Sequence, residues 1–312
     1  TCHDPVAGFT GPDSDINAGQ AVYPGAVHTR AGNRKPPTAA YGGESPVLYY
    51  DSDDEVWVGG MFWDGRATGW TLGDPLAEQA QGPFLNPLEQ NNANERFVCL
   101  RVAMSPYASL FEDVWLPGSL DPNHDVYGTY ERIARSISAY EQSDEVNPFD
   151  SQFDTFWDNV GDPAAVASIG MSNWADYKGM GLTDGELEGF ALFNEEEKGA
   201  CSLCHTLDAG AAGYPLFTDF TYDNLGVPKN LENPFYDMPR KWNPDGEDWI
   251  DPGIGGFLKS IGSAPVTYTA EWGKHKVPTL RNVDARPVAG FVKAFGHNGY
   301  FKSLLEITHF YN

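Results

Sequence analysis

The chain has 312 residues, of which 41% are hydrophobic, so it is long enough for one large domain or two ordinary ones. Its 44 acidic and 20 basic side chains give a formal net charge of −24. This charge argues against nucleic acid or an anionic membrane surface as the partner, because both bind clusters of Lys and Arg. It favours a basic protein partner, and general solubility is the alternative explanation.

The sequence predicts no membrane span, because no stretch approaches the roughly 20 uninterrupted apolar residues that a membrane helix needs. The chain begins at Thr1 without an initiator Met. We interpret this as a mature or trimmed start, which is compatible with an export signal that has been removed.

In the first half of the chain, residues 127–142 are expected to form a helix. There Ile133, Ile137 and Tyr140 recur at helical spacing. Gly161, Asp162 and Pro163 then break the pattern as a linker would. We therefore expect two domains, over residues 1–162 and 163–312.

The second half opens on a predicted helix start, where Thr183 is followed three residues later by Glu186, as in a capping box. Residues 210–276 are rich in Gly, Pro and Asn and predict a long ordered loop, a feature that usually wraps something bulky. Ser303 and Glu306 repeat the capping pattern and begin a terminal helix. With no solenoid repeat and no strong hairpin pattern, the fold class is expected to be mainly α.

Cysteine usage does not predict a disulfide framework, because one close pair and two isolated residues could staple very little. The isolated Cys99 is expected to be a buried small hydrophobe.

The strongest motif is Cys-Ser-Leu-Cys-His at residues 201–205. Thiols at this spacing, Cys201 and Cys204, can form thioethers with one haem, and the adjacent His205 can then ligate its iron. A zinc site would need a second ligand pair nearby, and a thioredoxin-like pair would need a βαβ context; the sequence predicts neither. Cys2 and His3 look like the end of a second such motif.

Five further blocks, in order along nearly the whole chain, resemble the signature blocks of bacterial di-haem cytochrome c peroxidases and MauG. They are Phe-Trp-Asp-Gly-Arg-Ala at 62–67, Glu-Gln-Ala-Gln-Gly-Pro at 78–83, Asn-Pro-Leu-Glu at 86–89, Lys-Val-Pro-Thr-Leu-Arg-Asn at 276–282 and Leu-Glu-Ile-Thr-His-Phe-Tyr-Asn at 305–312. The resemblance implies two cytochrome c-like haem domains with long ordered loops, and two covalently bound haem c groups.

Site residues follow from the same resemblance. His3 would be the proximal ligand of the N-terminal, peroxidatic haem, and His205 that of the C-terminal, electron-transfer haem. Trp63 stands at the position of the family's inter-haem tryptophan. The distal pocket beside the peroxidatic iron corresponds to Gln79, Pro83 and Glu89. A positioned carboxylate can move a proton between the two oxygens of a bound peroxide, so Glu89 is the candidate acid–base.

Tyr311 is expected to select the subfamily. The resemblance places a Met here, on the second haem, in peroxidases that take electrons from small cytochromes, and a Tyr in MauG. A phenolate oxygen stabilises ferric and higher iron, whereas Met favours ferrous iron. The alternatives are that Tyr311 only packs in its helix, or that His309 is the ligand; His309, two residues away, lies on a different helix face.

Two departures from the family pattern concern the first half. His28 falls near the place of a second axial His on the peroxidatic haem in classical enzymes, and the alternative is a solvent-facing loop residue. Members of the family often hold calcium between the haems, through an Asn. Lys35 stands at that place, although Asn33 is close, and a lysine ammonium there argues against calcium.

The function expected from the resemblance is a periplasmic or otherwise exported di-haem peroxidase. In the MauG-like interpretation, hydrogen peroxide generates a high-valent di-haem state that oxidises a Trp or Tyr of a partner protein by long-range electron transfer. The first alternative is a cytochrome c peroxidase that removes peroxide with a small donor cytochrome. The second is a non-catalytic di-haem electron carrier. Tyr311 favours the MauG-like interpretation.

Overall fold

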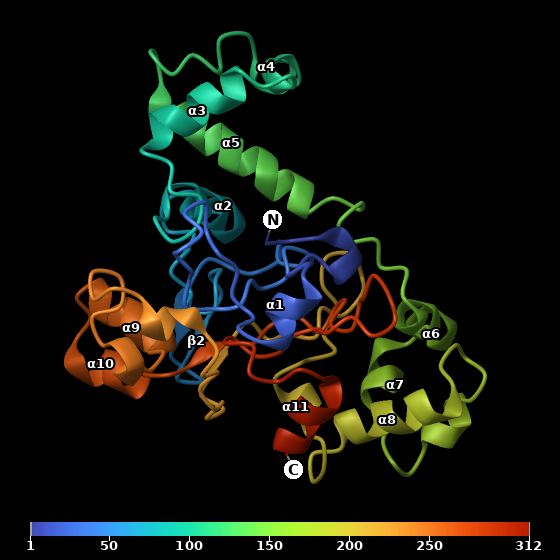
Figure 1. Ribbon diagram of the computed structural model, residues 1–312. Coiled ribbons are helices and arrows are strands. Elements are labelled where there is room, and N and C mark those ends of the chain that lie inside the picture. Colours follow the sequence, from blue (N-terminus) through green and yellow to red (C-terminus); the bar gives the residue numbers. More distant parts are fainter. Residues whose placement is uncertain (1, 312) are drawn as a thin grey trace.

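The computed structural model describes residues 2–311, and helices dominate its regular structure. Three groups of helices surround a centre made mostly of ordered loops (Figure 1). The first group is α2 (Pro75–Leu85), α3 (Glu95–Ala103), α4 (Ala108–Trp115) and α5 (Val126–Glu141). The second is α6 (Gln152–Val160), α7 (Pro163–Ala167) and α8 (Asp184–Asn194), and the third is α9 (Gly253–Ser260) and α10 (Pro265–Ala270). The short helix α1 (Ser14–Ala18) lies at the centre, and α11 (Leu304–Phe310) lies at the lower edge of the view, near the C-terminal end.

The strands are short and pair locally. β1 (Tyr49–Asp51) runs antiparallel to β2 (Val56–Val58), with Tyr50 opposite Trp57. β3 (Tyr222–Asp223) runs antiparallel to β4 (His275–Lys276) and joins segments that are far apart in the sequence. The prediction of a mainly α fold is therefore confirmed. No helix within residues 2–311 has the length and apolar character of a membrane span.

Local signals place several helices where the sequence predicts them. α5 buries Tyr130, Ile133 and Ala134 against α2 and α3. α8 begins with the predicted capping box, in which Thr183 and Glu186 exchange hydrogen bonds. Ser303 caps α11 by accepting a hydrogen bond from the backbone N–H of Glu306. Cys99 is fully buried between α3 and α5, as expected.

The prediction of a continuous loop over residues 210–276 is wrong in part, because α9 and α10 lie within it. α9 contains Gly253, Gly255 and Gly256, residues with poor helix propensity, so its sequence does not resemble a helix. Close packing selects these glycines: a Cβ on Gly255 would meet the backbone of Tyr268 at 2.6 Å. Tertiary contact with α10 therefore overrides local propensity.

The hydrophobic core crosses the predicted domain boundary between residues 162 and 163. Phe156 and Trp157 of α6 pack in one cluster with Val166 of α7 and with Leu187 and Phe190 of α8. α6 therefore belongs structurally with the helices of the second half.

A buried ion pair holds α6 to the centre of the molecule. Arg281 Nη1 lies 2.7 Å from Asp154 Oδ1, with both side chains almost completely buried. The Arg281 Nε–H donates to the carbonyl of Pro215 at 2.8 Å. We expect Asp154→Ala to lower the free energy of unfolding by about 3–5 kcal/mol, because an uncompensated charge remains buried.

Chemical unfolding of the purified protein, followed by circular dichroism, measures this effect. Glu188→Ala is the matched control, since Glu188 is exposed on neighbouring α8. Equal losses in the two variants would contradict the structural role of the pair.

Candidate haem-binding site

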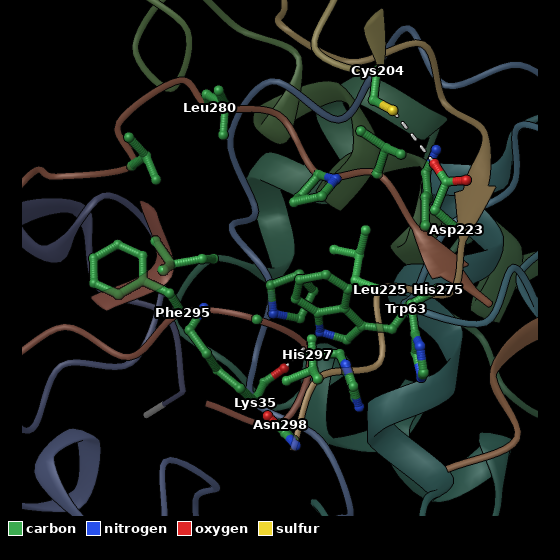
Figure 2. Close-up of a pocket in the computed structure, with 18 of the residues that line it drawn as sticks. Lys35, Trp63, Cys204, Asp223, Leu225, His275, Leu280, Phe295, His297 and Asn298 are labelled. Atoms are coloured by element: carbon green, nitrogen blue, oxygen red, sulfur yellow. Dashed lines mark hydrogen bonds between the residues drawn. The ribbon is translucent and has the colours of Figure 1, made fainter. Parts of the chain in front are cut away.

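A cavity of about 840 Å³ lies at the centre and is bordered by both ends of the Cys-Ser-Leu-Cys-His motif. The short 3₁₀ turn Cys201–Leu203 presents Cys201 and Cys204 to this cavity, and the His205 N–H donates to the Cys201 carbonyl at 2.9 Å. Burial, together with the charge of Asp223 3.6 Å from its sulfur, raises the pKa of the Cys204 thiol to about 12 (Figure 2). A thiol redox pair needs a lowered pKa, so this environment does not suit that function. The cavity volume lies in the range of cofactor sites.

A hydrogen bond at one ring nitrogen of His205 orients the other ring nitrogen to bind iron. Its Nδ1 lies 2.8 Å from the carbonyl oxygen of Phe217, which can only accept, so Nδ1 carries the proton. This hydrogen bond leaves the Nε2 lone pair free, the arrangement typical of a metal-ligating histidine. Burial lowers the pKa of His205 and favours the neutral ring.

His3 repeats this arrangement in the first half of the chain. Its Nδ1 lies 2.9 Å from the carbonyl oxygen of Phe9, and burial again lowers the pKa of the ring. Phe9 and Phe217 share a left-handed backbone conformation, with φ of 56° and 55°. The two predicted proximal histidines therefore have the same backbone anchor and the same free nitrogen.

The match extends into an internal two-fold repeat of hydrogen bonds around each histidine. In each half, the Thr that follows the anchoring Phe donates its hydroxyl at 2.7 Å to a backbone carbonyl of a Lys-x-Pro-Thr segment. The Thr of that segment donates its own hydroxyl to a backbone carbonyl just before the anchoring Phe. The first half has Thr10 to Pro36 and Thr38 to Gly8; the second has Thr218 to Val277 and Thr279 to Leu216. The repeat makes residues 35–38 and 276–279 equivalent.

Trp63 lies where the two repeats meet. Its indole N–H donates to the carbonyl of Lys35 at 2.9 Å, and its carbonyl accepts from the N–H of Lys276 at 3.0 Å. The N–H of Lys35 donates to the carbonyl of His297, which makes His297 the counterpart of Trp63 in the second half. The Trp63 side chain is 8% exposed, and Figure 2 shows it beside His275, His297 and Lys35.

A network of buried charges surrounds this junction. Arg34 bridges Asp64 and Asp251, at 2.5 and 2.6 Å, and Arg66 also binds Asp64 at 2.9 Å. Asp64 is thus paired with two arginines, Arg34 and Arg66. Arg34 holds the pKa of Asp251 well below its usual range, despite burial.

Sequence reasoning missed the partners of Asp251 in this network, His275 and His297. Their rings stack at 3.7 Å, and the three residues have ligand atoms within 4.8 Å of one another. Parallel rings do not aim two in-plane lone pairs at one ion, and Arg34 already occupies both Asp251 oxygens. Burial lowers the pKa of His297 to about 3, so its ring is neutral. The group is therefore better described as a polar network than as a metal site.

The predicted distal residues lie on α2 and the loop that follows it. Asp74 caps α2, and Gln79 and Pro83 are one turn apart on the same face. Asn86 donates to Glu89 Oε1 at 2.6 Å, and burial raises the pKa of Glu89 while Arg66 opposes the rise.

Burial raises the pKa of the Cys2 thiol and the charge of Glu89 adds to the rise, so Glu89 lies near the predicted attachment point of the first haem. Among the residues described, Gln79 makes no hydrogen bond with Glu89. The structure thus brings Glu89 toward Cys2 without pairing it with Gln79.

Tyr311 comes directly after α11. It borders the large cavity together with Leu304, Ile307 and Thr308, which lie on the inward face of that helix. Burial raises the pKa of Tyr311, and the Cys204 and Cys201 thiols raise it further, which places the phenol near the haem-attachment motif. His309 is exposed and is not part of the cavity wall.

His28 is exposed in a turn closed by the Arg30 N–H and the Val27 carbonyl. Its loop packs on the loop of Glu89, because the Ala26 N–H donates to the Glu89 carbonyl. His28 borders neither of the two cavities described.

Lys35 occupies the place where the family pattern puts a calcium ligand. Its Nζ lies 3.4 Å from Thr10 Oγ1 and 3.3 Å from the Pro36 carbonyl, and burial lowers its pKa to about 7. Calcium takes about six to eight oxygen ligands. A lysine side chain among these oxygens does not fit a calcium site.

A second cavity of about 240 Å³ lies beside His3, and its wall includes Glu141 at the end of α5. Burial raises the pKa of Glu141 to about 7, and its Oε2 has no hydrogen-bond partner among the residues described. Nothing in the sequence distinguishes Glu141 from a solvent-exposed helix residue.

Comparisons with known proteins agree with this geometry. Residues 1–161 match the family described as di-haem cytochrome c peroxidase. The whole chain is 32% identical to the methylamine utilization protein MauG of Paracoccus denitrificans (strain Pd 1222), covering 68% of that protein. It is 25% identical to the cytochrome-c peroxidase IdrP1 of Pseudomonas sp. (strain SCT), covering 65% of it.

Among solved structures, the diheme peroxidase BthA from Burkholderia thailandensis E264 superposes with a TM-score of 0.73 and 28% identity, over 100% of this chain and 65% of BthA. The chain therefore spans about two thirds of the length of these relatives.

Proposed function

Because the chain belongs to the di-haem cytochrome c peroxidase family, we propose that it is a peroxide-using oxidoreductase that carries two covalently attached haem c groups. The observation that carries the proposal is the repeated anchor of His3 and His205, which leaves each Nε2 free beside a haem-attachment cysteine. When bound, haem supplies the redox chemistry of the reaction with peroxide. His3 and His205 would hold the two irons, and Cys2, Cys201 and Cys204 would hold the porphyrins.

Glu89 is the residue that we assign to proton movement. Its carboxylate would accept a proton from one oxygen of hydrogen peroxide and return it to the other oxygen, the leaving group. Burial raises its pKa, and the hydrogen bond from Asn86 holds one carboxylate oxygen in place. Gln79 and Pro83, on one face of α2, would limit the size of the same pocket.

Trp63 is proposed to connect the two haem sites. Its ring is buried, and its backbone and indole bond to the Lys-x-Pro-Thr segments of both halves. A packed aromatic ring at this junction shortens the path for electron exchange between the halves.

Among peroxidases, we propose a MauG-like activity, in which a Trp or Tyr of a partner protein is oxidised. Two features support it: the similarity to MauG and the place of Tyr311 on the cavity wall. The similarity to IdrP1 supports the alternative, a cytochrome c peroxidase with a small donor cytochrome. The net charge of −24 suits a basic partner in either case. We propose export to the periplasm, where haem c proteins of this family would meet such partners.

Turnover with hydrogen peroxide and a reduced basic cytochrome c separates the two activities. The MauG-like proposal expects peroxide to be consumed without rapid cytochrome oxidation. Rapid steady-state oxidation would instead establish the cytochrome peroxidase activity. The non-catalytic alternative predicts that neither haem binds cyanide or carbon monoxide.

Tyr311→Phe tests the proposed ligand of the second haem. We expect the ferric absorption and EPR spectra of that haem to change and its reduction potential to rise, because a phenolate ligand stabilises ferric iron. Tyr300→Phe is the control, a partly exposed tyrosine that does not border the cavity. Unchanged spectra in Tyr311→Phe would show that another group, or none, occupies that position.

A further inference from the structure

The internal repeat makes Lys35 and Lys276 equivalent residues on the two sides of Trp63. Each begins a Lys-x-Pro-Thr segment, and each donates its backbone N–H across the junction to the other half. Both residues border the large cavity, where the haem-attachment motif also lies. Their positions follow from backbone hydrogen bonds and do not depend on the side chains.

The Lys276 ammonium is the clearest anomaly in this cavity. Its Nζ is buried and has no hydrogen-bond partner among residues 2–311. The Phe220 ring lies 4.6 Å away and offers only a cation–π contact. A buried, unpaired charge is strongly unfavourable, so a missing anion is expected beside it.

Lys35 is poorly satisfied as well. Its two contacts, to Thr10 Oγ1 at 3.4 Å and the Pro36 carbonyl at 3.3 Å, are long for a charged donor. Thr10, which follows the His3 anchor Phe9, donates to the Pro36 carbonyl beside Lys35, so Lys35 lies with the first haem site. Thr218, which follows the His205 anchor Phe217, donates in the same way to the Val277 carbonyl beside Lys276.

Two other lysines, the buried Lys293 of the cavity wall and the half-buried Lys302, already have partners. Lys293 donates to the Asn282 carbonyl at 2.7 Å, and Lys302 donates to three backbone carbonyls at 2.6–2.9 Å. The shortage of acceptors is therefore specific to Lys35 and Lys276, the pair related by the repeat.

We propose that Lys35 and Lys276 each bind a haem propionate, Lys35 that of the His3 haem and Lys276 that of the His205 haem. A carboxylate supplies the acceptor that each ammonium lacks, in a charge-assisted hydrogen bond. The two lysines then provide the positive charge that a divalent cation would otherwise bring to the junction around Trp63. This inference rests on the proposed function only in requiring that two haems are bound.

Reduction potentials of the purified holoprotein test the pairing, measured for each haem by optical and EPR-monitored titration. In Lys276→Met, we expect the potential of the His205 haem to fall while that of the other haem stays constant, because an unpaired propionate stabilises ferric iron. Lys35→Met should lower only the potential of the His3 haem. Lys276→Arg should retain most of the wild-type value.

Lys229→Met is the matched control, since Lys229 borders the same cavity but already donates to the Glu247 carbonyl at 3.0 Å. The inference is overturned if both haems are present and neither potential shifts in Lys276→Met and Lys35→Met, or if Lys229→Met gives the same shift. If either Met variant does not fold, the corresponding arginine variant and a glutamine variant give the same comparison.

Failure of the proposed function gives a different result. If the haems are present and the potentials shift as expected, but peroxide does not react, the lysine–propionate pairs stand and the peroxidase function falls. If no haem is attached, both are overturned.

Discussion

Replacing Cys201 and Cys204 together with alanine should yield a protein that has lost one covalently bound haem. The thioethers form only through these two sulfurs, and His205 by itself holds iron by coordination, which denaturation reverses. Mass spectrometry of the denatured protein, with and without the substitutions, measures the expected loss of the mass of one haem. Peroxide-dependent oxidation of substrate should fall to background in the same variant.

Cys99→Ala is the control for this pair. Cys99 of α3 is fully buried against α5 and is not among the residues that border the large cavity. The variant should retain the haem content of the parent protein. An unchanged mass difference in the double variant would contradict the assignment of residues 201–205 as a haem-attachment motif.

Glu89→Gln should slow the reaction with peroxide by about 10²–10⁴-fold, the usual contribution of a positioned acid–base group. Glutamine keeps the shape of the side chain and the contact with Asn86 but cannot accept a proton. Stopped-flow absorption after mixing with peroxide measures the rate. Haem content and the ferric spectrum should stay unchanged, since Glu89 is not assigned to either iron.

The pH dependence of the rate of reaction with peroxide is a second test of Glu89. Burial raises the pKa of Glu89, so its carboxylate form appears at a higher pH than for an exposed glutamate. The rate in the parent protein should therefore rise as the pH passes through this raised pKa. In Glu89→Gln, the rate should no longer rise in that pH range. Glu188→Gln, on the exposed face of α8, should keep both the rate and its rise with pH. A parent-like profile in Glu89→Gln would exclude Glu89 as the acid–base.

Helices that are marked by a capping motif or by helical periodicity could be predicted from the sequence. The capping box at Thr183 and the helical periodicity of Ile133 and Ile137 act over a few residues, so they can be recognised without tertiary knowledge. α9 could not be predicted in this way, because its glycines are required by close packing against α10 and not by local helix propensity. The domain boundary was placed at a linker-like Gly-Asp-Pro, but α6 packs with the second half through Phe156.

The candidate site likewise contains residues that could be recognised from the sequence and others that only the folded structure brings together. The motif at residues 201–205 carries its chemistry in its spacing, and the anchors of His3 and His205 agree with it. The internal repeat is hard to recognise in the sequence, because its equivalences lie in hydrogen bonds and the halves share only the short groups Cys-His, Phe-Thr and Lys-x-Pro-Thr. His275 and His297 are 22 positions apart in the chain, and only the folded structure brings their rings together.

The most direct test of the account is a titration of the diferric protein with one equivalent of hydrogen peroxide, followed by EPR and near-infrared absorption. We expect the ferric signals of both haems to disappear together, because Trp63, which bonds to both halves, is proposed to connect the two haem sites. Ferric signals that persist, with no reaction even after one haem is reduced, would contradict the proposed peroxide chemistry and favour an electron carrier.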